Sequence, residues 1–235
     1  MKQGWMFFNP LEYHCALKGH VKMAIEYGLR EYRRRLAVRF EEYLKGNLLD
    51  VGCGDGLLWD LDYFSKIVKY LVGVDVQSST NWIKIKKENM DYMCCDVRYL
   101  PFRSESFNVV FIKDVLHHVD DPQRAFNEIL RSSNDRIILV EANRYDPVTF
   151  VHMTLARGHD HFSLRKLKQL VRSRTNFAIF LQRESHFYPL RSVTLFKLLW
   201  ALEDIAERIP VLRDFLSYNI ALITKQPISQ KNNRK

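Results

Sequence analysis

Short apolar runs recur through the middle of the chain and are separated by segments with helical spacing. Five of them are Leu48–Val51, Tyr70–Val74, Tyr92–Cys95, Val109–Ile112 and Ile137–Val140. Runs of this length that alternate with helical segments are typical of buried strands in βα units. Two later segments, Phe177–Leu181 and Tyr218–Thr224, indicate a sixth and a seventh strand. The pattern predicts an α/β fold with a doubly wound, mostly parallel sheet of seven strands.

A long amphipathic helix is predicted ahead of the first strand. Its apolar positions recur at intervals of three and four residues and are Val21, Ile25, Leu29, Tyr32, Leu36, Phe40 and Leu44. This spacing predicts a helix over Lys18–Leu44 that packs on the domain or covers its mouth. Because Gly28 interrupts the segment, we expect a break in the helix near it.

Two later helices carry start signals. Asp121 provides an N-cap side chain before Pro122 at the first helical position, and Ser163 is a second N-cap. The apolar faces that follow are Ala125, Phe126, Ile129 and Leu130 in the first helix, and Leu164, Leu167, Leu170 and Val171 in the second. A third amphipathic segment, Leu195–Ile209, ends at Pro210 and is more typical of a core helix than of a membrane anchor.

The first strand runs directly into a glycine-rich turn, within the sequence NLLDVGCGDG. The glycines of the turn are Gly52, Gly54 and Gly56. Glycine adopts positive φ without strain and lets a ligand approach main-chain N–H groups at a helix N-terminus. Asp50 lies two residues before the first glycine. The spacing differs from the dinucleotide fingerprint G-x-G-x-x-G, whose third glycine would fall at Leu57.

Carboxylates end the second and third predicted strands. In a doubly wound sheet, ligands bind outside the carboxyl ends of the strands, so these side chains are candidates for ligand contacts. Asp75, in VGVDV, is placed to accept both hydroxyls of a ribose. Asp96, in CDVRYLPF, is placed to accept a hydrogen bond from an exocyclic amine such as adenine N6. The competing interpretation is that each carboxylate caps the following helix.

Composition favours a globular protein without a membrane span. Hydrophobic residues make up 47% of the 235-residue chain, which suffices for a buried core. The longest uncharged stretches, Pro147–Ala156 and Phe215–Thr224, are half of the roughly 20 residues that a membrane-spanning helix needs. The N-terminal segment has no apolar run followed by a small-residue cleavage site. We therefore expect a cytoplasmic protein.

The chain carries a net charge of +9, concentrated in two segments, Arg30–Arg39 and Arg157–Arg191. Solvated helix faces are the simplest interpretation of both, although the charge would also attract nucleic acid, anionic lipid or an acidic small molecule. The four cysteines are irregularly spaced, which argues against a disulfide framework or a zinc site, and we expect them to be reduced and the protein to hold no metal. They are Cys15, Cys53, Cys94 and Cys95.

Five motifs together resemble the class I S-adenosylmethionine-dependent methyltransferases, specifically the methyltransferase type 11 group. The motifs are LLDVGCGDG, VGVDV, CDVRYLPF, SFNVVFIKDVLHHVDDPQRAFNEILR and IILVEAN, from about Leu48 to Val140. Each is unspecific alone, but their order and spacing are those of the family. The chain departs from it before the fifth strand, where RSSNDRIIL replaces the usual glycine-rich turn.

The resemblance implies S-adenosylmethionine as cofactor and S-adenosylhomocysteine as product, bound in a Rossmann-like fold. Asp50, Gly52 and Gly54 would hold the methionine end, Asp75 the ribose, Asp96 with Val97 the adenine, and Lys113 would lie at the methionine or substrate side. Gly56 and Val76 are further candidates for cofactor binding. The sulfonium makes the methyl group electrophilic, so transfer needs mainly alignment and exclusion of water. No N/D-P-P-Y/F motif follows the fourth strand, which disfavours methylation of nucleobase amines.

A general base helps only when the acceptor is a hydroxyl or an acidic carbon. Imidazoles titrate near physiological pH, so the candidates are histidines. His159 and His161, in RGHDHFS, fall where the family places a loop that faces the substrate. His117 and His118 are further candidates, although the LHH segment recurs in the family as a turn.

By the same resemblance, the acceptor is a small or lipid-like molecule methylated at oxygen or carbon, and a peripheral membrane contact is compatible with it. The predicted division is a helical lid or arm at 1–45, a methyltransferase domain at 46–225 with substrate-side insertions at about 142–163 and 186–217, and a flexible tail at 226–235. Aromatic residues of the arm either roof the substrate or pack on the core; they are Trp5, Phe7, Phe8 and Tyr13.

Two alternatives stay open from the sequence. A nicotinamide-dependent oxidoreductase would share the sheet and the ribose carboxylate, but the missing third glycine counts against it. The other alternative is a methyltransferase-like module that binds cofactor or a partner without turnover. The sequence leaves it open because no single residue is indispensable for methyl transfer. Nucleic acid is disfavoured as a partner because no RNA-binding appendage is recognisable.

Overall fold

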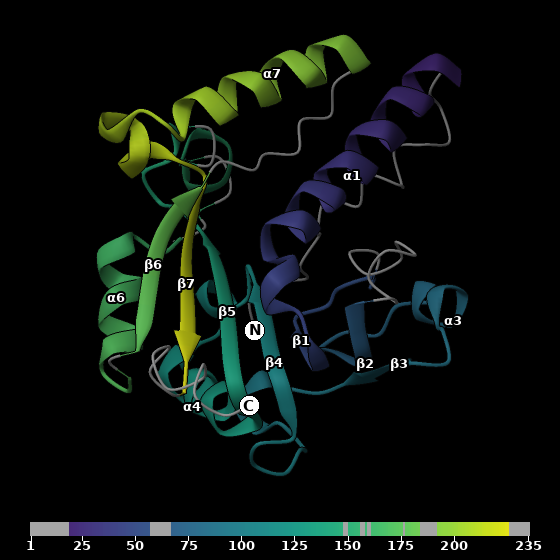
Figure 1. Cartoon of the computed structure of the whole chain (residues 1–235), viewed down its shortest axis with the longest axis vertical. Coiled ribbons are helices and arrows are strands. Elements are labelled where there is room, and N and C mark those ends of the chain that lie inside the picture. Colours follow the sequence, from purple (N-terminus) through teal and green to yellow (C-terminus); the bar gives the residue numbers. More distant parts are fainter. Residues whose placement is uncertain are drawn as a thin grey trace, which may run out of the picture.

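The computed structural model describes residues 19–56, 67–147, 150–155, 158, 161–175, 177–183 and 192–225. Within these residues seven strands form one sheet in the order β3-β2-β1-β4-β5-β7-β6 (Figure 1). The strands are β1 Gly46–Val51, β2 Val68–Asp75, β3 Met90–Cys94, β4 Phe107–Lys113, β5 Ser133–Ala142, β6 Ala178–Arg183 and β7 Tyr218–Thr224. The first five pair in parallel, and β7 is antiparallel to both β5 and β6. The predicted α/β fold with a mostly parallel sheet is confirmed.

Helices cover both faces of the sheet because the central strands are apolar on both sides. Leu49 and Val51 of β1 belong to the core under α4 (Pro122–Ser132) and α6 (Leu164–Arg172). Leu48, the residue before Leu49, belongs to the core under α1 (Gly19–Phe40). Successive side chains of a strand point to opposite faces, so an apolar run without alternation is buried from both sides.

The helix start signals work as predicted. The carboxylate of Asp121 accepts a hydrogen bond from the backbone N–H of Arg124 at 2.9 Å, and α4 begins at Pro122. The hydroxyl of Ser163 accepts a hydrogen bond from the backbone N–H of Lys166 at 3.2 Å at the start of α6.

The remaining helical elements are α3 Asn81–Ile85, α7 Val193–Ala206, the 3-10 helices η2 Glu41–Tyr43, η4 Val97–Tyr99, η5 Leu116–His118 and η7 Pro210–Phe215, and the π-helix η6 Phe150–Leu155.

The expected break of the first helix at Gly28 is wrong. α1 runs without interruption from Gly19 to Phe40. Gly28 serves packing instead, because a Cβ atom there would lie 2.2 Å from Cζ of Phe196 on α7. The absent side chain lets the two helices approach closely, and both lie in the upper part of Figure 1.

Among the described residues, no helix combines the length and the apolarity needed to cross a bilayer. The predicted segment Leu195–Ile209 forms α7 and the turn after it. Only one side of α7 faces the protein interior, where Phe196, Trp200 and Glu203 are buried. The expectation of a core helix therefore holds for this side alone.

Candidate active site

A hollow of about 230 Å³ lies at the carboxyl ends of β1, β2 and β4. These strands meet where the chain order of the sheet reverses, because β2 lies on one side of β1 and β4 on the other. In open α/β sheets, ligands bind at such a switch point. Of the residues predicted to contact cofactor, Gly52, Asp75, Val76, Asp96, Val97 and Lys113 line the hollow.

The three glycines of the turn have different surroundings, and of them only Gly52 lines the hollow. Gly52 has φ +76°, and a Cβ atom there would lie 2.1 Å from Cγ2 of Val115, which also lines the hollow. Gly54 has φ +55°, and the position of its absent Cβ has no heavy atom within 4 Å. Gly56, in contrast, packs on α3, since its Cβ would lie 2.6 Å from Cδ1 of Ile85.

The N–H groups of this turn are already bonded within the protein. Those of Gly52 and Cys53 donate to the carbonyl of Val74 at 2.7 and 3.0 Å. That of Gly54 donates to the carboxylate of Asp75 at 2.9 Å. These three N–H groups therefore fasten the turn to β2, and the helix N-terminus expected after the turn lies outside the described residues.

Asp75 keeps acceptor capacity toward the hollow. Its Oδ2 accepts from Gly54 N and its Oδ1 from Gln77 N at 3.0 Å. A carboxylate offers about four lone-pair sites, so each oxygen keeps room for one more donor. Asp50, by contrast, is buried within β1 and does not line the hollow.

Asp96 caps a helix, as the competing interpretation had it. Its carboxylate accepts from the backbone N–H of Arg98 at 2.9 Å and is held by the Arg98 guanidinium at 2.6 to 3.1 Å. These hydrogen bonds lower the pKa of Asp96, although burial acts against them. Both oxygens are occupied, so Asp96 lines the hollow with little acceptor capacity left for an adenine amine.

A charged cluster lines the hollow at the end of β4. The ammonium of Lys113 donates to the carboxylate of Asp114 and, at 3.0 Å, to the hydroxyl of Tyr218. Burial by itself would lower the pKa of Lys113. The attraction of the Asp114 carboxylate outweighs the effect of burial and raises this pKa well above its usual value. Burial likewise opposes the Asp114 carboxylate, yet Lys113 lowers its pKa. Lys113 is therefore a cation in this site and not a base near neutral pH.

Three of the four candidate histidines come together beside this cluster. The ring centroid of His117 lies 3.7 Å from that of His118 and 4.6 Å from that of His161. His118 lines the hollow, whereas His117 and His161 lie behind it. His161 is 3% exposed and therefore buried beside His117. His159 lies outside the described residues, as do the aromatic residues of the N-terminal arm, Cys15 and the tail at 226–235.

Glu141 at the end of β5 organises the histidines and was not identified from the sequence. Its Oε2 lies 2.6 Å from Nδ1 of His117, and its Oε1 accepts from the N–H groups of Val115 and Leu116 at 3.1 and 2.7 Å. Burial lowers the pKa of His117, but the hydrogen bond to Glu141 outweighs it, so the pKa is raised. The sequence signal was an acid directly after an apolar strand, in IILVEAN.

The atoms of Asp114, His117 and Glu141 that can bind a metal lie within 4.8 Å of one another. The same atoms are engaged in hydrogen bonds, since Lys113 and the N–H of Ala142 donate to Asp114, and Glu141 holds His117. A metal ion would have to displace the Lys113 ammonium. The cluster is therefore best described as a hydrogen-bond network.

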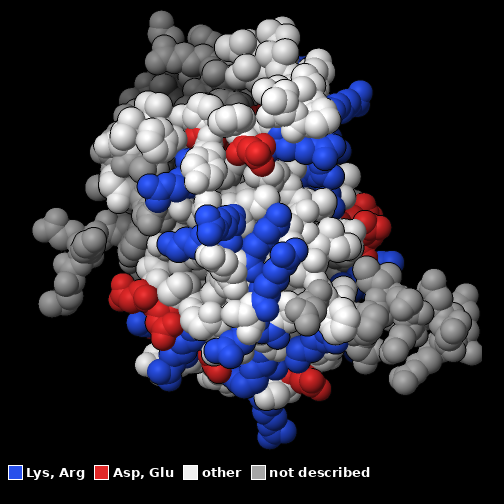
Figure 2. Space-filling view, turned by 90° about the vertical axis from the view of Figure 1, so that its left-hand side faces the viewer, with Lys and Arg blue, Asp and Glu red and all other residues white. Residues whose placement is uncertain are grey.

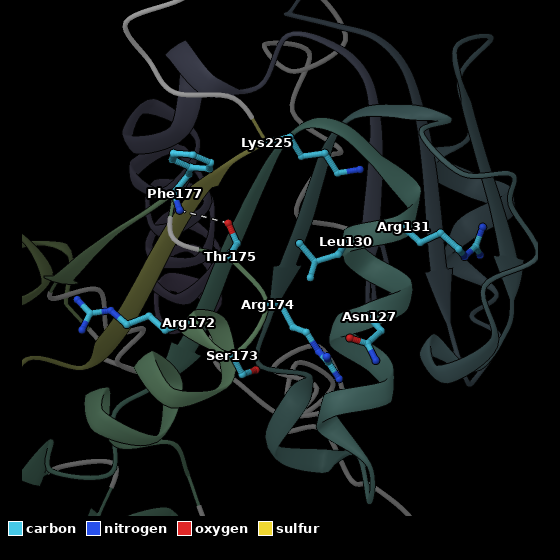
Figure 3. Close-up of a pocket in the computed structure, with 9 residues that line it drawn as sticks. All are labelled: Asn127, Leu130, Arg131, Arg172, Ser173, Arg174, Thr175, Phe177 and Lys225. Atoms are coloured by element: carbon cyan, nitrogen blue, oxygen red, sulfur yellow. Dashed lines mark hydrogen bonds between the residues drawn. The ribbon is translucent and has the colours of Figure 1, made fainter.

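A wider hollow of about 790 Å³ opens at the opposite end of the sheet, between α4, the turn after α6 and the end of β7. Lys and Arg residues gather on one face of the molecule (Figure 2). Figure 3 shows that the basic side chains of the hollow do not converge. Arg131 is turned away and donates to the carbonyls of Leu100 and Phe102, and Arg172 lies 5.5 Å over the ring of Phe180. The smaller hollow is the candidate active site.

Comparisons with known proteins bear on the family and on the fold. Residues 49–136 match the family model described as "Methyltransferase domain". A ubiquinone biosynthesis O-methyltransferase of Coxiella burnetii is 36% identical over 87 residues, which are 34% of this chain and 36% of that protein. An uncharacterized protein of Methanocaldococcus jannaschii is 30% identical over 111 residues, 46% of each chain. The chain thus matches less than half the length of these curated relatives.

Solved structures show the same fold over most of the chain. A SAM-dependent methyltransferase from Archaeoglobus fulgidus aligns with a TM-score of 0.57 and 14% identity, covering 82% of this chain and 94% of that one. The [4+2]-cyclase SpnF aligns with a TM-score of 0.54 and 20% identity, covering 81% and 80%. The fold is the Rossmann-like methyltransferase fold, and the cyclase illustrates that this fold alone does not fix the reaction.

Proposed function

We propose that the chain carries a class I methyltransferase domain of the type 11 group and transfers a methyl group from S-adenosylmethionine to a small or lipid-like acceptor, at oxygen or carbon. One observation carries this proposal. The carboxylate of Asp75 lies at the switch point of the sheet, is fixed by Gly54 N and Gln77 N, and keeps acceptor capacity toward the hollow. This is what recognition of two ribose hydroxyls requires.

The other lining residues fit the rest of the cofactor. Val76 and Val97 line the hollow and offer apolar sides for an adenine. Lys113 uses two of its three N–H donors on Asp114 and Tyr218. Its third is available for a carboxylate or for an oxygen of the acceptor. When bound, S-adenosylmethionine supplies an electrophilic methyl group, and the residues of this chain align the acceptor and exclude water.

His118 is the residue of this site best placed to take a proton from a hydroxyl acceptor, because it lines the hollow. The ring of His117 lies against that of His118 and is held by Glu141. The relative in Coxiella burnetii is named an O-methyltransferase of ubiquinone biosynthesis, which supports a hydroxyl as acceptor. A general base of this kind contributes about 10²- to 10⁴-fold in rate.

The glycine turn argues against the oxidoreductase alternative. Dinucleotide enzymes use N–H groups at the first turn to bind a pyrophosphate. Here the N–H groups of Gly52, Cys53 and Gly54 donate to Val74 and Asp75 instead.

Calorimetry with S-adenosylhomocysteine and NAD in parallel tests the proposed class. We expect the wild type to bind S-adenosylhomocysteine and not NAD. In Asp75→Ala, affinity should fall by about 1 to 3 kcal/mol, because charged hydrogen bonds to the ribose are lost. The matched control is Asp91→Ala, which removes an aspartate of the neighbouring strand that pairs with Lys86 at 2.6 Å and lies outside the hollow.

Thermal unfolding of both variants shows that they are folded. Binding of NAD alone would overturn the proposed class. An unchanged affinity in Asp75→Ala, with Asp91→Ala also unchanged, would contradict the ribose assignment. Labelled cofactor with lipid, glycan and RNA fractions then identifies the acceptor, and binding without transfer to any fraction would favour the non-catalytic module.

A further inference from the structure

The outer side of α7 and η7 is an exposed apolar surface. On α7, Leu195, Leu198, Leu202 and Ile205 recur at intervals of three and four residues, so they share one face of the helix. The surface continues through Ile209, Val211, Leu212 and Phe215. These eight side chains are 38% to 76% exposed. We call them the α7 apolar surface; a contiguous apolar patch of this kind on a soluble domain marks an interaction site.

The inner side of α7 explains why the apolar surface faces outward. Phe196 and Trp200 are buried against α1. The acids of the helix are paired on this side as well, Asp204 with Arg35 at 2.6 Å and Glu207 with Arg39 at 2.9 Å. The orientation of α7 is therefore fixed by packing and by ion pairs.

The exposed charged residues of the segment 192–216 are three basic and two acidic ones, and one of the acids, Asp204, is paired with Arg35. Lys197, Arg208 and Arg213 are exposed along the same segment. Asp214 is the exposed acid of the segment that is not paired with α1. An amphipathic helix with exposed apolar residues and flanking cations is typical of proteins that lie on an anionic bilayer. A second copy would fit less well, because a two-fold contact of this face would bring the same cations together.

The surface lies at the end of the sheet that holds the candidate active site. Figure 1 shows α7 across this end, above the point where β6 finishes. Asn143, two residues after Glu141, donates from its side-chain amide to the carbonyls of Asp214 and Leu216 at 2.9 and 2.8 Å. Phe150, Val151 and Leu155 of η6, the helix after β5, are exposed as well. A bilayer that contacted α7 would therefore lie close to the loops around the hollow.

From this geometry we propose that the α7 apolar surface docks on an anionic lipid bilayer. The apolar side chains enter the headgroup region, and Lys197, Arg208 and Arg213 meet the lipid phosphates. The link to a lipid-like acceptor rests on the proposed function; the docking itself does not.

Flotation with vesicles tests the docking on the full chain. Vesicles of phosphatidylglycerol and phosphatidylcholine in equal parts should bind the wild type, and vesicles of phosphatidylcholine alone should bind it less. In the variant Leu198→Ser, Leu202→Ser, Ile205→Ser, partitioning should fall about tenfold or more, because buried apolar area drives insertion. The matched control is Ile83→Ser, Ile179→Ser, which changes exposed apolar residues of α3 and β6 and should leave partitioning unchanged.

Circular dichroism and calorimetry with S-adenosylhomocysteine show whether the variants are folded. Absence of vesicle binding by the wild type, or equal binding by the serine variant, would overturn the proposal. So would a wild-type dimer in light scattering that the serine variant abolishes, since the surface would then meet a second copy. Vesicle binding without S-adenosylhomocysteine binding would leave the docking supported and refute the proposed function.

Discussion

His117 and Glu141 form a buried pair that binds a proton more tightly in the folded protein than in the unfolded chain. The His117 side chain is 3% exposed and lies 2.6 Å from Oε2 of Glu141. Burial opposes its charge, and the pair with Glu141 outweighs that cost, so the folded-state pKa is raised above the usual value of about 6.5. The pair therefore stabilises the fold while His117 is protonated.

The sign of the pH dependence follows from the raised pKa. The contribution of His117 to the free energy of unfolding is fully present below about pH 6.5 and is lost as pH rises through the raised pKa. His117→Gln should therefore cost about 1 to 3 kcal/mol at acidic pH, and less at alkaline pH. Urea unfolding at several pH values measures this. Glu141→Gln should show the same reduced dependence, and a slope equal to that of the wild type in both variants would contradict the assignment.

At the scale of elements, the packing of α1 on α7 uses features that look unrelated in the sequence. The simplest interpretation of the basic segment Arg30–Arg39 is a solvated helix face. In the structure two of its residues form ion pairs instead, Arg35 with Asp204 of α7 and Arg39 with Glu207, the residue after α7. Gly28 supplies the close approach for Phe196. The contact orients α7, so that one side is buried and the other carries the α7 apolar surface.

Gly28→Ala tests this contact. In an ordinary helix interior this change stabilises by about 1 kcal/mol. Here the new Cβ would lie 2.2 Å from the ring of Phe196, which is fully buried, so the ring or the helix would have to shift. We expect the free energy of unfolding to fall by about 1 to 3 kcal/mol in urea titrations. In a Phe196→Leu background the same change should cost less, and equal costs in both backgrounds would show that the ring is not the obstacle.

For the whole molecule, ligand binding and folding are coupled because the hollow exists only in the assembled sheet. It draws residues from β1, β2 and β4 and from the loops after them. S-adenosylhomocysteine at about 100 times its dissociation constant should therefore raise the free energy of unfolding by about 2.7 kcal/mol. The urea midpoint should rise with no change in the m-value, and Asp75→Ala should show a smaller rise at the same ligand concentration. No shift in the wild type would contradict binding at this site.

Most of the fold was predictable because its signals are local. The strand β7 was predicted with its observed bounds, and α4 begins at the proline that follows its N-cap. These features depend on apolar runs and capping residues a few positions apart. The break predicted at Gly28 was wrong because the reason for that glycine lies on α7, near the other end of the chain.

The amino-acid sequence by itself determined the α/β class, the strand series, the glycine turn and the identity of the carboxylates at the strand ends, since each follows from residues that are neighbours along the chain. Only the tertiary structure decided which polar groups remain available. It paired Asp96 with Arg98, bonded the N–H groups of the turn to β2, and joined Glu141 to His117. A hydrogen bond or an ion pair is settled by distance in space, which apolar periodicity does not encode.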